Sequence, residues 1–281
     1  MRSIFNSNWA YIPYHIHPVA FSIGPVRVHW YGLMYLTAFF IVYFLVLYRI
    51  RTESLSYSKE SILDFMFLAI ACLFAGGRLG YVLFYNLPYY LANPIKIISP
   101  FSFSNGIHYT GIYGMSFHGA LIGVFLAFMY YCRKNKMNPW RFIDLFVPAI
   151  PLGYTFGRIG NFINGELYGR VTTVPWGMYF PLDGTHQLRH PSQLYEAFFE
   201  GIVLFVVLWN LRKVRSFDGF LSAGYLIGYG TFRFFIEFFR QPDPQLGFVL
   251  GPFSMGQILC FIMVVAGTAI LAGHRKDFLR R

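Results

Sequence analysis

The chain has 281 residues, of which 56% are hydrophobic, 21% aromatic and only 12% charged, with a formal net charge of +11. Soluble domains usually carry about 25% charged residues, so the composition argues against one and favours a protein whose surface faces hydrocarbon. The basic residues form no patch interleaved with aromatic residues, so we expect no nucleic-acid partner.

Seven apolar stretches are long enough to cross a bilayer as helices of about 20 residues. In chain order they are 28–48, 61–84, 112–132, 142–163, 193–211, 219–239 and 252–272. We therefore predict an all-α integral membrane protein with seven transmembrane helices in one polytopic domain, 1–281. The segment 164–192, between the fourth and fifth spans, is predicted to lie outside the membrane.

The N-terminal stretch 1–19 has neither a compact apolar core nor a small-residue cleavage site, so we predict no removable signal peptide. Cys72, Cys132 and Cys260 lie inside or at the ends of apolar stretches. Their placement predicts no structural disulfide, and their spacing fits no metal site.

Lysine and arginine are unevenly distributed among the connecting segments. The loops 49–60, 133–141 and 212–218 and the tail 274–281 hold 14 of the 23, whereas the segments on the other side hold 6. Basic loops stay in the cytoplasm. The N-terminus is therefore predicted outside and the C-terminus inside.

Several polar residues then fall in the outer halves of the spans. An ionisable residue inside a span is a functional candidate, because its burial in lipid is costly. Five spans contribute to the set, and its members are His29, Tyr31, Arg78, His118, Arg158, Arg233 and Glu237. Their convergence at one depth predicts a site facing the outer leaflet.

The stretch FGRIGNFINGELYGR, residues 156–170, is the densest part of this set. Arg158 and Asn161 are three residues apart and share a helix face, as do Arg233 and Glu237, four apart. Glycines in the fourth span permit close approach of a neighbouring helix or lipid, and Pro148 and Pro151 are expected to bend that span.

Taken singly, these residues have plainer explanations. Arg78 is equally compatible with snorkelling to the outer headgroups. Arg233 with Glu237 is compatible with a structural ion pair. An isolated His118 is more often a packing residue.

Three further residues have plain explanations too. Tyr31 alone is typical of an aromatic belt. Glu196 and Glu200, at the start of the fifth span, are expected to face the outer aqueous side. A site is therefore predicted from the convergence of several residues and from none of them singly.

Two arginines at headgroup depth suit a phosphate, because the guanidinium fork pairs with it bidentately and stays charged. The nearest phosphate in a membrane belongs to a phospholipid. The residues therefore predict either a lipid substrate or a tightly held structural lipid.

The motif GRIGNFINGELYGR (157–170) resembles the signature of the prolipoprotein diacylglyceryl transferase family. Other segments resemble that family in the same order: FSIGPVRVHWYGLMY (21–35), GGRLGYVLFYN (76–86), GMSFHGALIG (114–123), RHPSQLYEA (189–197), GYGTFRFFIEFFRQPD (228–243) and SMGQIL (254–259). The segment 171–188 departs from the pattern, since it is short against some members.

The resemblance implies a multi-pass enzyme of the bacterial inner membrane, with its active site toward the outer leaflet. It implies transfer of the diacylglyceryl group of phosphatidylglycerol to a thiol, with glycerol phosphate as the leaving group. The acceptor would be the lipobox cysteine of a preprolipoprotein, before its signal peptide is removed. No metal or organic cofactor is implied.

Carried over residue by residue, the resemblance assigns phosphate-binding roles to Arg158 and Arg233 and substrate-binding roles to several others. Those others are Asn161, Glu166 and Gly169 of the long motif and Glu237 beside Arg233. Tyr31 of the HWYG motif is assigned to the catalytic residues together with the two arginines. His118 of the SFHG motif is our candidate general base, because histidine titrates near neutral pH.

Three other functions remain open from the sequence. A transporter or channel needs polar residues along a path through both leaflets, and the inner halves of the spans are almost uncharged. A non-catalytic lipid-binding or scaffold protein would use the arginines to hold an annular lipid. Another headgroup transferase would use them with a different acceptor.

Overall fold

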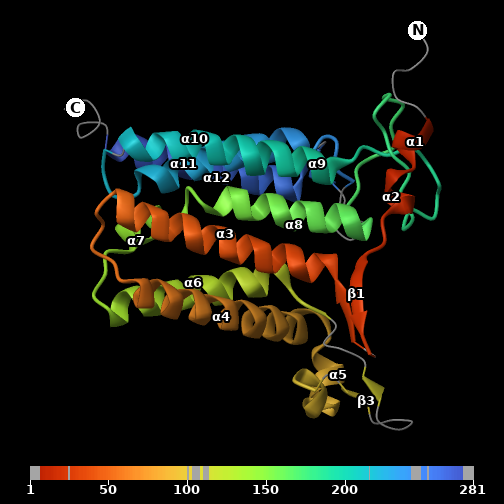
Figure 1. Ribbon diagram of the computed structural model, residues 1–281, viewed down its shortest axis with the longest axis horizontal. Coiled ribbons are helices and arrows are strands. Elements are labelled where there is room, and N and C mark those ends of the chain that lie inside the picture. The colour runs from red at the N-terminus through yellow and green to blue at the C-terminus, as the bar shows by residue number, and fades with distance from the viewer. Residues whose placement is uncertain are drawn as a thin grey trace. The chain divides into compact units, whose positions relative to one another are not determined.

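The computed structural model describes residues 7–24, 26–99, 101–102, 108–109, 114–214, 216–241, 248–251 and 253–274, and they are mostly helical (Figure 1). The described strands form three antiparallel hairpins: β1 (Val19–Ile23) with β2 (Val26–His29), β3 (Phe101–Ser102) with β4 (His108–Tyr109), and β5 (Phe248–Leu250) with β6 (Phe253–Ser254). The all-α prediction missed these hairpins, which satisfy part of the backbone between helices.

The chain divides into two compact units. One comprises Met1–Glu53 with Ile143–Arg281, and the other comprises Ser54–Phe142. Their described helices are considered separately below, with α7 (Pro139–Phe146) crossing the boundary in the sequence.

The larger unit contains most of the helices. They are α1 (Ser7–Ala10), α2 (Ile12–His15), α3 (Trp30–Thr52), α8 (Ile150–Asn164), α9 (Ser192–Glu196), a π-helix (Ala197–Val203), α10 (Leu204–Leu211), a 3-10 turn (Arg212–Val214), α11 (Phe220–Ile236) and α12 (Met255–Gly273). Helix α8 lies along α3, and α12 lies along α11 (Figure 1).

Small residues allow the helices of these two pairs to approach each other closely. A side chain added at Gly160 would meet the Tyr31 ring at 3.2 Å, and one at Gly153 would meet Val42 at 3.0 Å, so both glycines allow α8 to approach α3. A Cβ at Gly230 of α11 would lie 2.8 Å from the Cys260 carbonyl of α12. The predicted close approach at the glycines of the fourth span is confirmed for Gly153 and Gly160.

The smaller unit is built on a third close helix pair, α4 (Lys59–Tyr85) and α6 (Phe117–Lys134). Glycines face each other across it, and a Cβ at Gly76 or Gly119 would collide with the backbone carbonyl of the other. Helix α5 (Leu87–Ala92) and a 3-10 turn (Pro94–Ile97) follow α4.

Four of the described helical segments are long and apolar enough to cross a membrane: Trp30–Thr52, Lys59–Tyr85, Ser192–Val214 and Met255–Gly273. They correspond to the first, second, fifth and seventh predicted spans. The helices at the third and sixth predicted spans, α6 and α11, have 18 and 17 residues. The first residues of the third and seventh predicted spans include 112, 113 and 252, which lie outside the described residues.

The predicted span 142–163 is divided in the structure. Helix α7 ends at Phe146, a turn follows, and α8 begins at Ile150. Pro148 lies in that turn, and Pro151 is in the first turn of α8, where a missing N–H is tolerated. The expected proline bend is thus a break between two helices.

Buried polar groups fix this break to the start of α11. The Asp144 carboxylate accepts hydrogen bonds from the Gly219 and Ser222 backbone N–H groups at 2.8 and 2.9 Å and from the Ser222 hydroxyl at 2.7 Å. Buried Arg49 donates to the Asp144 and Leu145 carbonyls, both at 2.7 Å. The carbonyls and N–H groups that have no partner within these helix ends are therefore paired with charged side chains.

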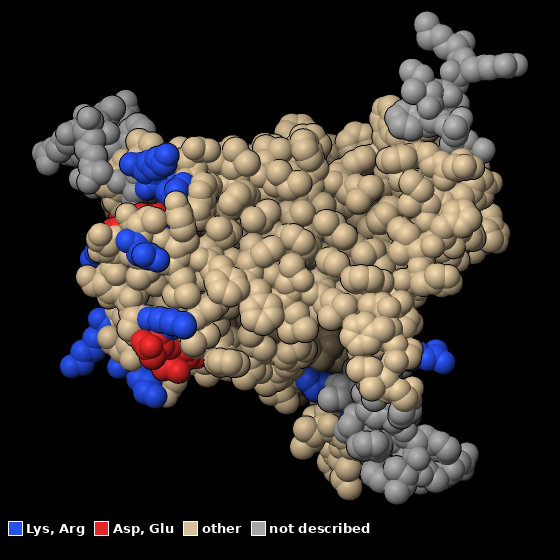
Figure 2. Space-filling view, viewed as in Figure 1, with Lys and Arg blue, Asp and Glu red and all other residues tan. Residues whose placement is uncertain are grey.

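The visible face of the larger unit shows how charge is distributed along its helices. Lysine, arginine and acidic side chains lie at the helix ends, and none of the described ones covers the middle of α3 or α10 (Figure 2). Large apolar side chains of these stretches are exposed, among them Phe40, Phe44 and Val206. Such an uncharged band is what a hydrocarbon environment requires.

The Asp144 contacts give a stability prediction. Replacing Asp144 by Ala leaves two buried N–H groups without acceptors, so we expect a loss of about 2 kcal/mol. Thermal unfolding of the purified protein in detergent should show a lower midpoint for Asp144→Ala. Asp64→Asn is the control, because Asp64 is exposed; equal midpoints for the two variants would contradict the assignment.

Candidate functional site

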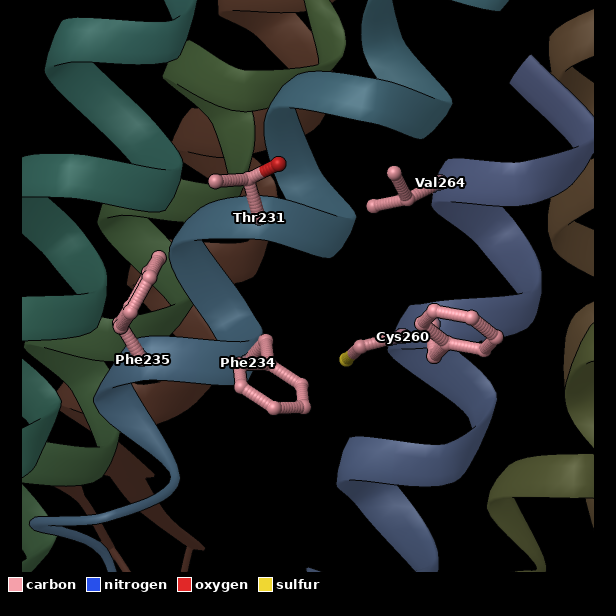
Figure 3. A pocket seen from close by; sticks show the side chains of 6 residues that line it. Thr231, Phe234, Phe235, Cys260 and Val264 are labelled. Atoms are coloured by element: carbon pink, nitrogen blue, oxygen red, sulfur yellow. The ribbon is translucent and has the colours of Figure 1, made fainter. Parts of the chain in front are cut away.

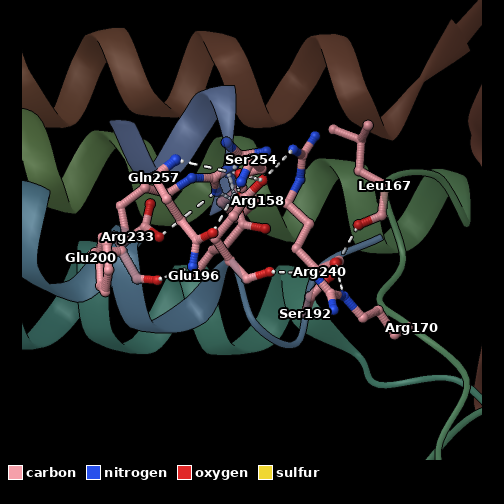
Figure 4. Close-up of polar contacts among 12 residues, drawn as sticks. Arg158, Leu167, Arg170, Ser192, Glu196, Glu200, Arg233, Arg240, Ser254 and Gln257 are labelled. Atoms are coloured by element: carbon pink, nitrogen blue, oxygen red, sulfur yellow. Dashed lines mark hydrogen bonds and ion pairs between the residues drawn. The ribbon is translucent and has the colours of Figure 1, made fainter. Parts of the chain in front are cut away.

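A buried carboxylate holds two arginines together in the larger unit. Glu196, at the end of α9, is 0% exposed. Its Oε2 lies 2.8 Å from Arg158 Nε of α8 and 2.7 Å from Arg233 Nη1 of α11 (Figure 4). Two guanidinium groups from separate helices, Arg158 and Arg233, therefore meet at one oxygen, as their predicted convergence requires.

Two more carboxylates surround Arg233. Glu237 lies four residues further on, and its Oε2 is 3.2 Å from Arg233 Nη2, so the predicted i, i+4 pair is confirmed. Glu200 Oε1 is 3.7 Å from Arg233 Nη1. The Tyr154 hydroxyl donates to Glu200 Oε2 at 2.5 Å, and the Tyr154 ring lies under the Arg158 guanidinium at 4.7 Å.

The π-helix brings Glu196 and Glu200 to these arginines. Glu196 precedes the segment and Glu200 lies inside it. The Thr155 hydroxyl donates to the Ala197 carbonyl at 3.2 Å, and a side chain at Gly201 would collide with that hydroxyl. A π-helical turn is uncommon and is often found at functional sites.

The prediction for these two glutamates was wrong. We expected Glu196 and Glu200 to face the outer water, whereas both are buried against Arg158 and Arg233. The available signal was charge balance: two arginines at one depth of an apolar chain need carboxylates at that depth, because unpaired buried charge is costly.

The long motif forms the end of α8 and the turn after it. Arg158 Nη1 donates to Asn161 Oδ1 at 3.2 Å, which confirms their predicted common face. Asn161 Nδ2 donates in turn to Glu166 Oε1 at 2.8 Å. Gly165 ends the helix at φ +69°, a conformation that favours glycine, and so turns Glu166 back toward Asn161.

Gly169 has a packing role in the structure. A Cβ there would lie 2.5 Å from the Phe239 carbonyl and 2.7 Å from His190, so only glycine fits. Its neighbour Arg170 donates to the Arg240 carbonyl at 2.9 Å and to the Glu237 carbonyl at 3.3 Å. These contacts attach the segment 164–192 to the end of α11.

A second ion pair stabilises the same segment. Arg189 Nε donates to Asp183 Oδ2 at 2.8 Å and Nη2 to Oδ1 at 3.0 Å, a bidentate pair. Burial alone would raise the pKa of the Asp183 carboxyl, but hydrogen bonds from Arg189 and Thr185 hold it well below its usual range. Phe162, Met178 and Phe180 form the apolar core beneath.

Tyr31 is the other predicted site residue in the larger unit. It is the second residue of α3 and packs against Gly160. Its hydroxyl lies 3.1 Å from the Tyr35 hydroxyl, within electrostatic reach of Asn161 and Glu166. The structure therefore brings Tyr31 to the polar end of α8.

His118 and Arg78 belong to the smaller unit. His118 is exposed near the start of α6, with its ring edge-on to Phe117. Arg78 donates to the Lys96 and Ile97 carbonyls at 2.6 and 2.7 Å and lies over the Tyr90 ring. These contacts give Arg78 a structural role, in fixing the 3-10 turn after α5 to α4.

A shallow apolar hollow of about 180 Å³ lies between α11 and α12 (Figure 3). Its wall is formed by Thr231, Phe234, Phe235, Cys260, Phe261 and Val264. The lining suits an acyl chain and offers almost nothing to a polar headgroup.

All three cysteines are free thiols.

The two arginines share their cluster with three carboxylates. The side chains of Arg158 and Arg233 are 17% and 12% exposed, so each is partly accessible. Arg158 Nη2 has no hydrogen-bond partner among the described residues. Over the same residues, no three His, Cys, Asp or Glu side chains form a group that would hold a metal ion.

The fold and the site together define a helical membrane protein in which two arginines and three carboxylates form one cluster. Residues 18–272 match the family described as prolipoprotein diacylglyceryl transferase. The chain therefore belongs to the prolipoprotein diacylglyceryl transferase family.

Individual relatives carry the name phosphatidylglycerol–prolipoprotein diacylglyceryl transferase. A protein of Chlorobaculum tepidum is 56% identical over 273 residues, 97% of this chain and 94% of that protein. One of Geobacter sulfurreducens is 47% identical over 264 residues, 93% and 97% of the two chains. One of Campylobacter jejuni is 46% identical over 265 residues, 94% of each chain.

The Asp183 pair gives a pH prediction. The pKa of Asp183 is lower in the folded protein than the value of about 3.9 in an unfolded chain. The pair's contribution to stability is therefore complete above about pH 4 and is lost as the pH falls below it. Hydrogen exchange of the segment 171–189, corrected for intrinsic rates, should show protection falling from about pH 4 downward.

Asp183→Asn is the comparison, because it removes the titrating group. In this variant the segment should be less protected at neutral pH and should show no further step near pH 4. A step of the same size in both proteins would contradict the assignment to Asp183.

Proposed function

We propose that this protein transfers the diacylglyceryl group of phosphatidylglycerol to the thiol of a lipobox cysteine in a preprolipoprotein, releasing glycerol phosphate. Membership of the family and the names of relatives at 46–56% identity support this activity. The observation that carries it in the structure is the pair of guanidinium groups meeting at Glu196.

We propose the bacterial inner membrane as the location, with seven spans, the N-terminus outside and the C-terminus in the cytoplasm. In this arrangement the four longer segments form four of the seven spans. The other three spans are α6, α7 together with α8, and α11. The asymmetry of basic residues supports the direction.

The position of the site along its helices supports an active site in the outer leaflet. Arg158 is six residues from the end of α8 and Arg233 three from the end of α11. At 1.5 Å per residue, both are within about 10 Å of the helix end, well short of the middle of a 30 Å bilayer core. Phospholipid phosphates and a membrane-anchored signal peptide would meet there.

In the proposed reaction, the lipid phosphate binds to the accessible edges of Arg158 and Arg233. The cysteine thiolate attacks the carbon of the diacylglyceryl group that carries the phosphoester. A C–S bond forms, and the bond from that carbon to the phosphate oxygen breaks. The leaving glycerol phosphate gains one negative charge on the bridging oxygen. The two guanidinium groups stabilise that charge in a site with little water.

Surrounding residues position these groups. Glu237 restricts the rotamers of Arg233, and Asn161 and Tyr31 donate hydrogen bonds to headgroup oxygens. Glu166 orients Asn161, and Gly169 allows the backbone of the outer segment to approach closely. We propose Asn161, Glu166, Gly169 and Glu237 as substrate-binding residues together with the two arginines, and Tyr31 as a catalytic residue.

The thiol must lose its proton, since a cysteine has a pKa of about 8.5 and the thiolate is the nucleophile. We propose His118 as the general base. In the alternative, the two arginines alone lower the pKa of the thiol enough for attack.

Competing functions make different demands on the structure. A transporter needs a polar path with its site near the midplane, whereas Arg158 and Arg233 lie near helix ends. A flux assay in proteoliposomes distinguishes a transporter from a transferase, because only the transporter would move a solute across the membrane. A lipid-binding scaffold would leave its bound phospholipid chemically unchanged, and another headgroup transferase would not modify a cysteine.

One assay tests the proposed activity and the arginines together. Purified protein is incubated with phosphatidylglycerol and a lipobox peptide, and mass spectrometry detects a diacylglyceryl adduct on the cysteine. Arg158→Ala and Arg233→Ala should each lower turnover by roughly 10²-fold or more, since losing one such donor costs about 3 kcal/mol in barrier.

Two controls accompany this assay. A peptide with serine in place of the cysteine should give no adduct, and Arg51→Ala, at the exposed end of α3, should retain wild-type turnover. Wild-type turnover in Arg158→Ala or Arg233→Ala, with normal membrane insertion, would refute that arginine's catalytic role.

The base is tested separately. His118→Gln keeps the size of the side chain but removes the titrating group, so turnover should fall by roughly 10²-fold and the rise of rate with pH should disappear. Substantial turnover with an unchanged pH profile would assign His118 a structural role and favour activation by the arginines.

A further inference from the structure

A closed circuit of contacts borders one side of the arginine pair. Arg158 contacts Asn161, which contacts the Glu166 carboxylate. The Glu166 backbone carbonyl accepts a hydrogen bond from Gln193 Nε2 at 2.6 Å. Gln193 is three residues before Glu196 on α9, and Glu196 pairs with Arg158. The circuit thus returns to its start.

Three buried acceptor atoms on or beside this circuit are unpaired. They are Gln193 Oε1 and Glu196 Oε1 of the circuit and Oδ1 of Asn164, which contacts Glu166, and none of the three has a hydrogen-bond partner in the part of the chain that the structure describes. Gln193 is 0% exposed. Leaving a buried polar atom without a hydrogen bond destabilises the folded protein, so three such atoms close together indicate a missing partner.

The amide of Gln193 has one favoured orientation. Its Nε2 faces the Glu166 carbonyl, an acceptor, so that position must be filled by the nitrogen and the oxygen must point elsewhere. Asn164 is similar, since its Nδ2 faces Glu166 Oε1 at 3.4 Å and its Oδ1 is left over. Both side chains therefore present oxygens that call for a hydrogen-bond donor.

The position of these acceptors limits what the donor is. One helical turn of three residues separates Gln193 from Glu196, about 4.5 Å along the axis. Gln193 thus lies one turn from the carboxylate that pairs with both arginines. A phosphatidylglycerol headgroup has two hydroxyl groups within three carbons of its phosphate, and both are hydrogen-bond donors.

We propose that Gln193 and Asn164 form a subsite that accepts hydrogen bonds from the hydroxyls of the headgroup glycerol and so recognises phosphatidylglycerol. This inference rests on the proposed transferase function. It assigns selectivity for the headgroup to residues outside the arginine pair, which binds the phosphate that all phospholipids share. A lipobox backbone N–H is the competing occupant.

The test compares two lipids with the same charge and phosphodiester. Phosphatidylethanol lacks headgroup hydroxyls, so it replaces phosphatidylglycerol in the transfer assay at a fixed concentration of lipobox peptide. The wild-type protein should use phosphatidylglycerol with a kcat/KM about tenfold or more above that for phosphatidylethanol. In Gln193→Met this ratio should fall toward one, whatever loss of turnover the two lipids share.

Two variants keep the result interpretable. Gln193→Glu retains an acceptor oxygen but loses the donor to Glu166, so the lipid ratio should stay high even where turnover falls. Asn164→Ala removes the second acceptor and leaves Gln193 unchanged, so it should lower the lipid ratio independently. It therefore tests the subsite even if Gln193→Met does not fold.

Three results would overturn the subsite. The first is equal use of both lipids by the wild type. The second is an equal loss of turnover for both lipids in Gln193→Met and Asn164→Ala. The third is an altered KM for the peptide with an unchanged lipid ratio, which would assign the acceptors to the signal peptide. The absence of any adduct from phosphatidylglycerol in the wild type would instead refute the proposed function.

Discussion

The rest of the structure depends on one buried interaction, the Glu196 carboxylate held between Arg158 and Arg233. A carboxylate that is 0% exposed is tolerated only with strong counter-charge, and two guanidinium groups provide it at 2.8 and 2.7 Å. The same contact fixes the two guanidinium groups relative to each other before any substrate arrives. Fixed charge of this kind needs no reorganisation when negative charge develops.

Each helix that contributes a charge is held in place by a local feature of the sequence. Gly160 and Gly153 set α8 against α3, and the π-helix with Gly201 brings Glu196 toward α8. Glu237 serves as a connection: its carboxylate contacts Arg233 and accepts from the Ser254 hydroxyl that caps α12. The orientation of Arg233 is therefore tied to the start of the last helix.

Much of this arrangement was predictable from residue pattern. Apolar length predicted the helical segments, and i, i+3 and i, i+4 spacing predicted the Arg158–Asn161 and Arg233–Glu237 contacts, because these depend only on local helix geometry. The meeting of the two arginines was predicted because the basic loops set the direction of the spans, which placed both arginines at the same depth in the membrane.

Other features could not be predicted, because they arise from tertiary contacts. The burial of Glu196 and Glu200 depends on the π-helix, which needs the Thr155 hydroxyl from another helix. The structural role of Arg78 depends on carbonyls of a later turn, and the packing of Gly169 on the distant residues His190 and Phe239. The hairpins escaped notice because two- to five-residue strands carry little periodicity.

The most direct test of the central claim measures where a lipid phosphate lies. Solid-state NMR of the protein with 15N-labelled arginine in phosphatidylglycerol bilayers reports dipolar coupling between lipid phosphorus and guanidinium nitrogen. The account predicts a lipid phosphorus about 4 Å from two guanidinium groups, with one coupling lost in Arg158→Lys and the other in Arg233→Lys. Couplings that persist unchanged in both variants, or no phosphorus within about 7 Å of either arginine, would contradict it.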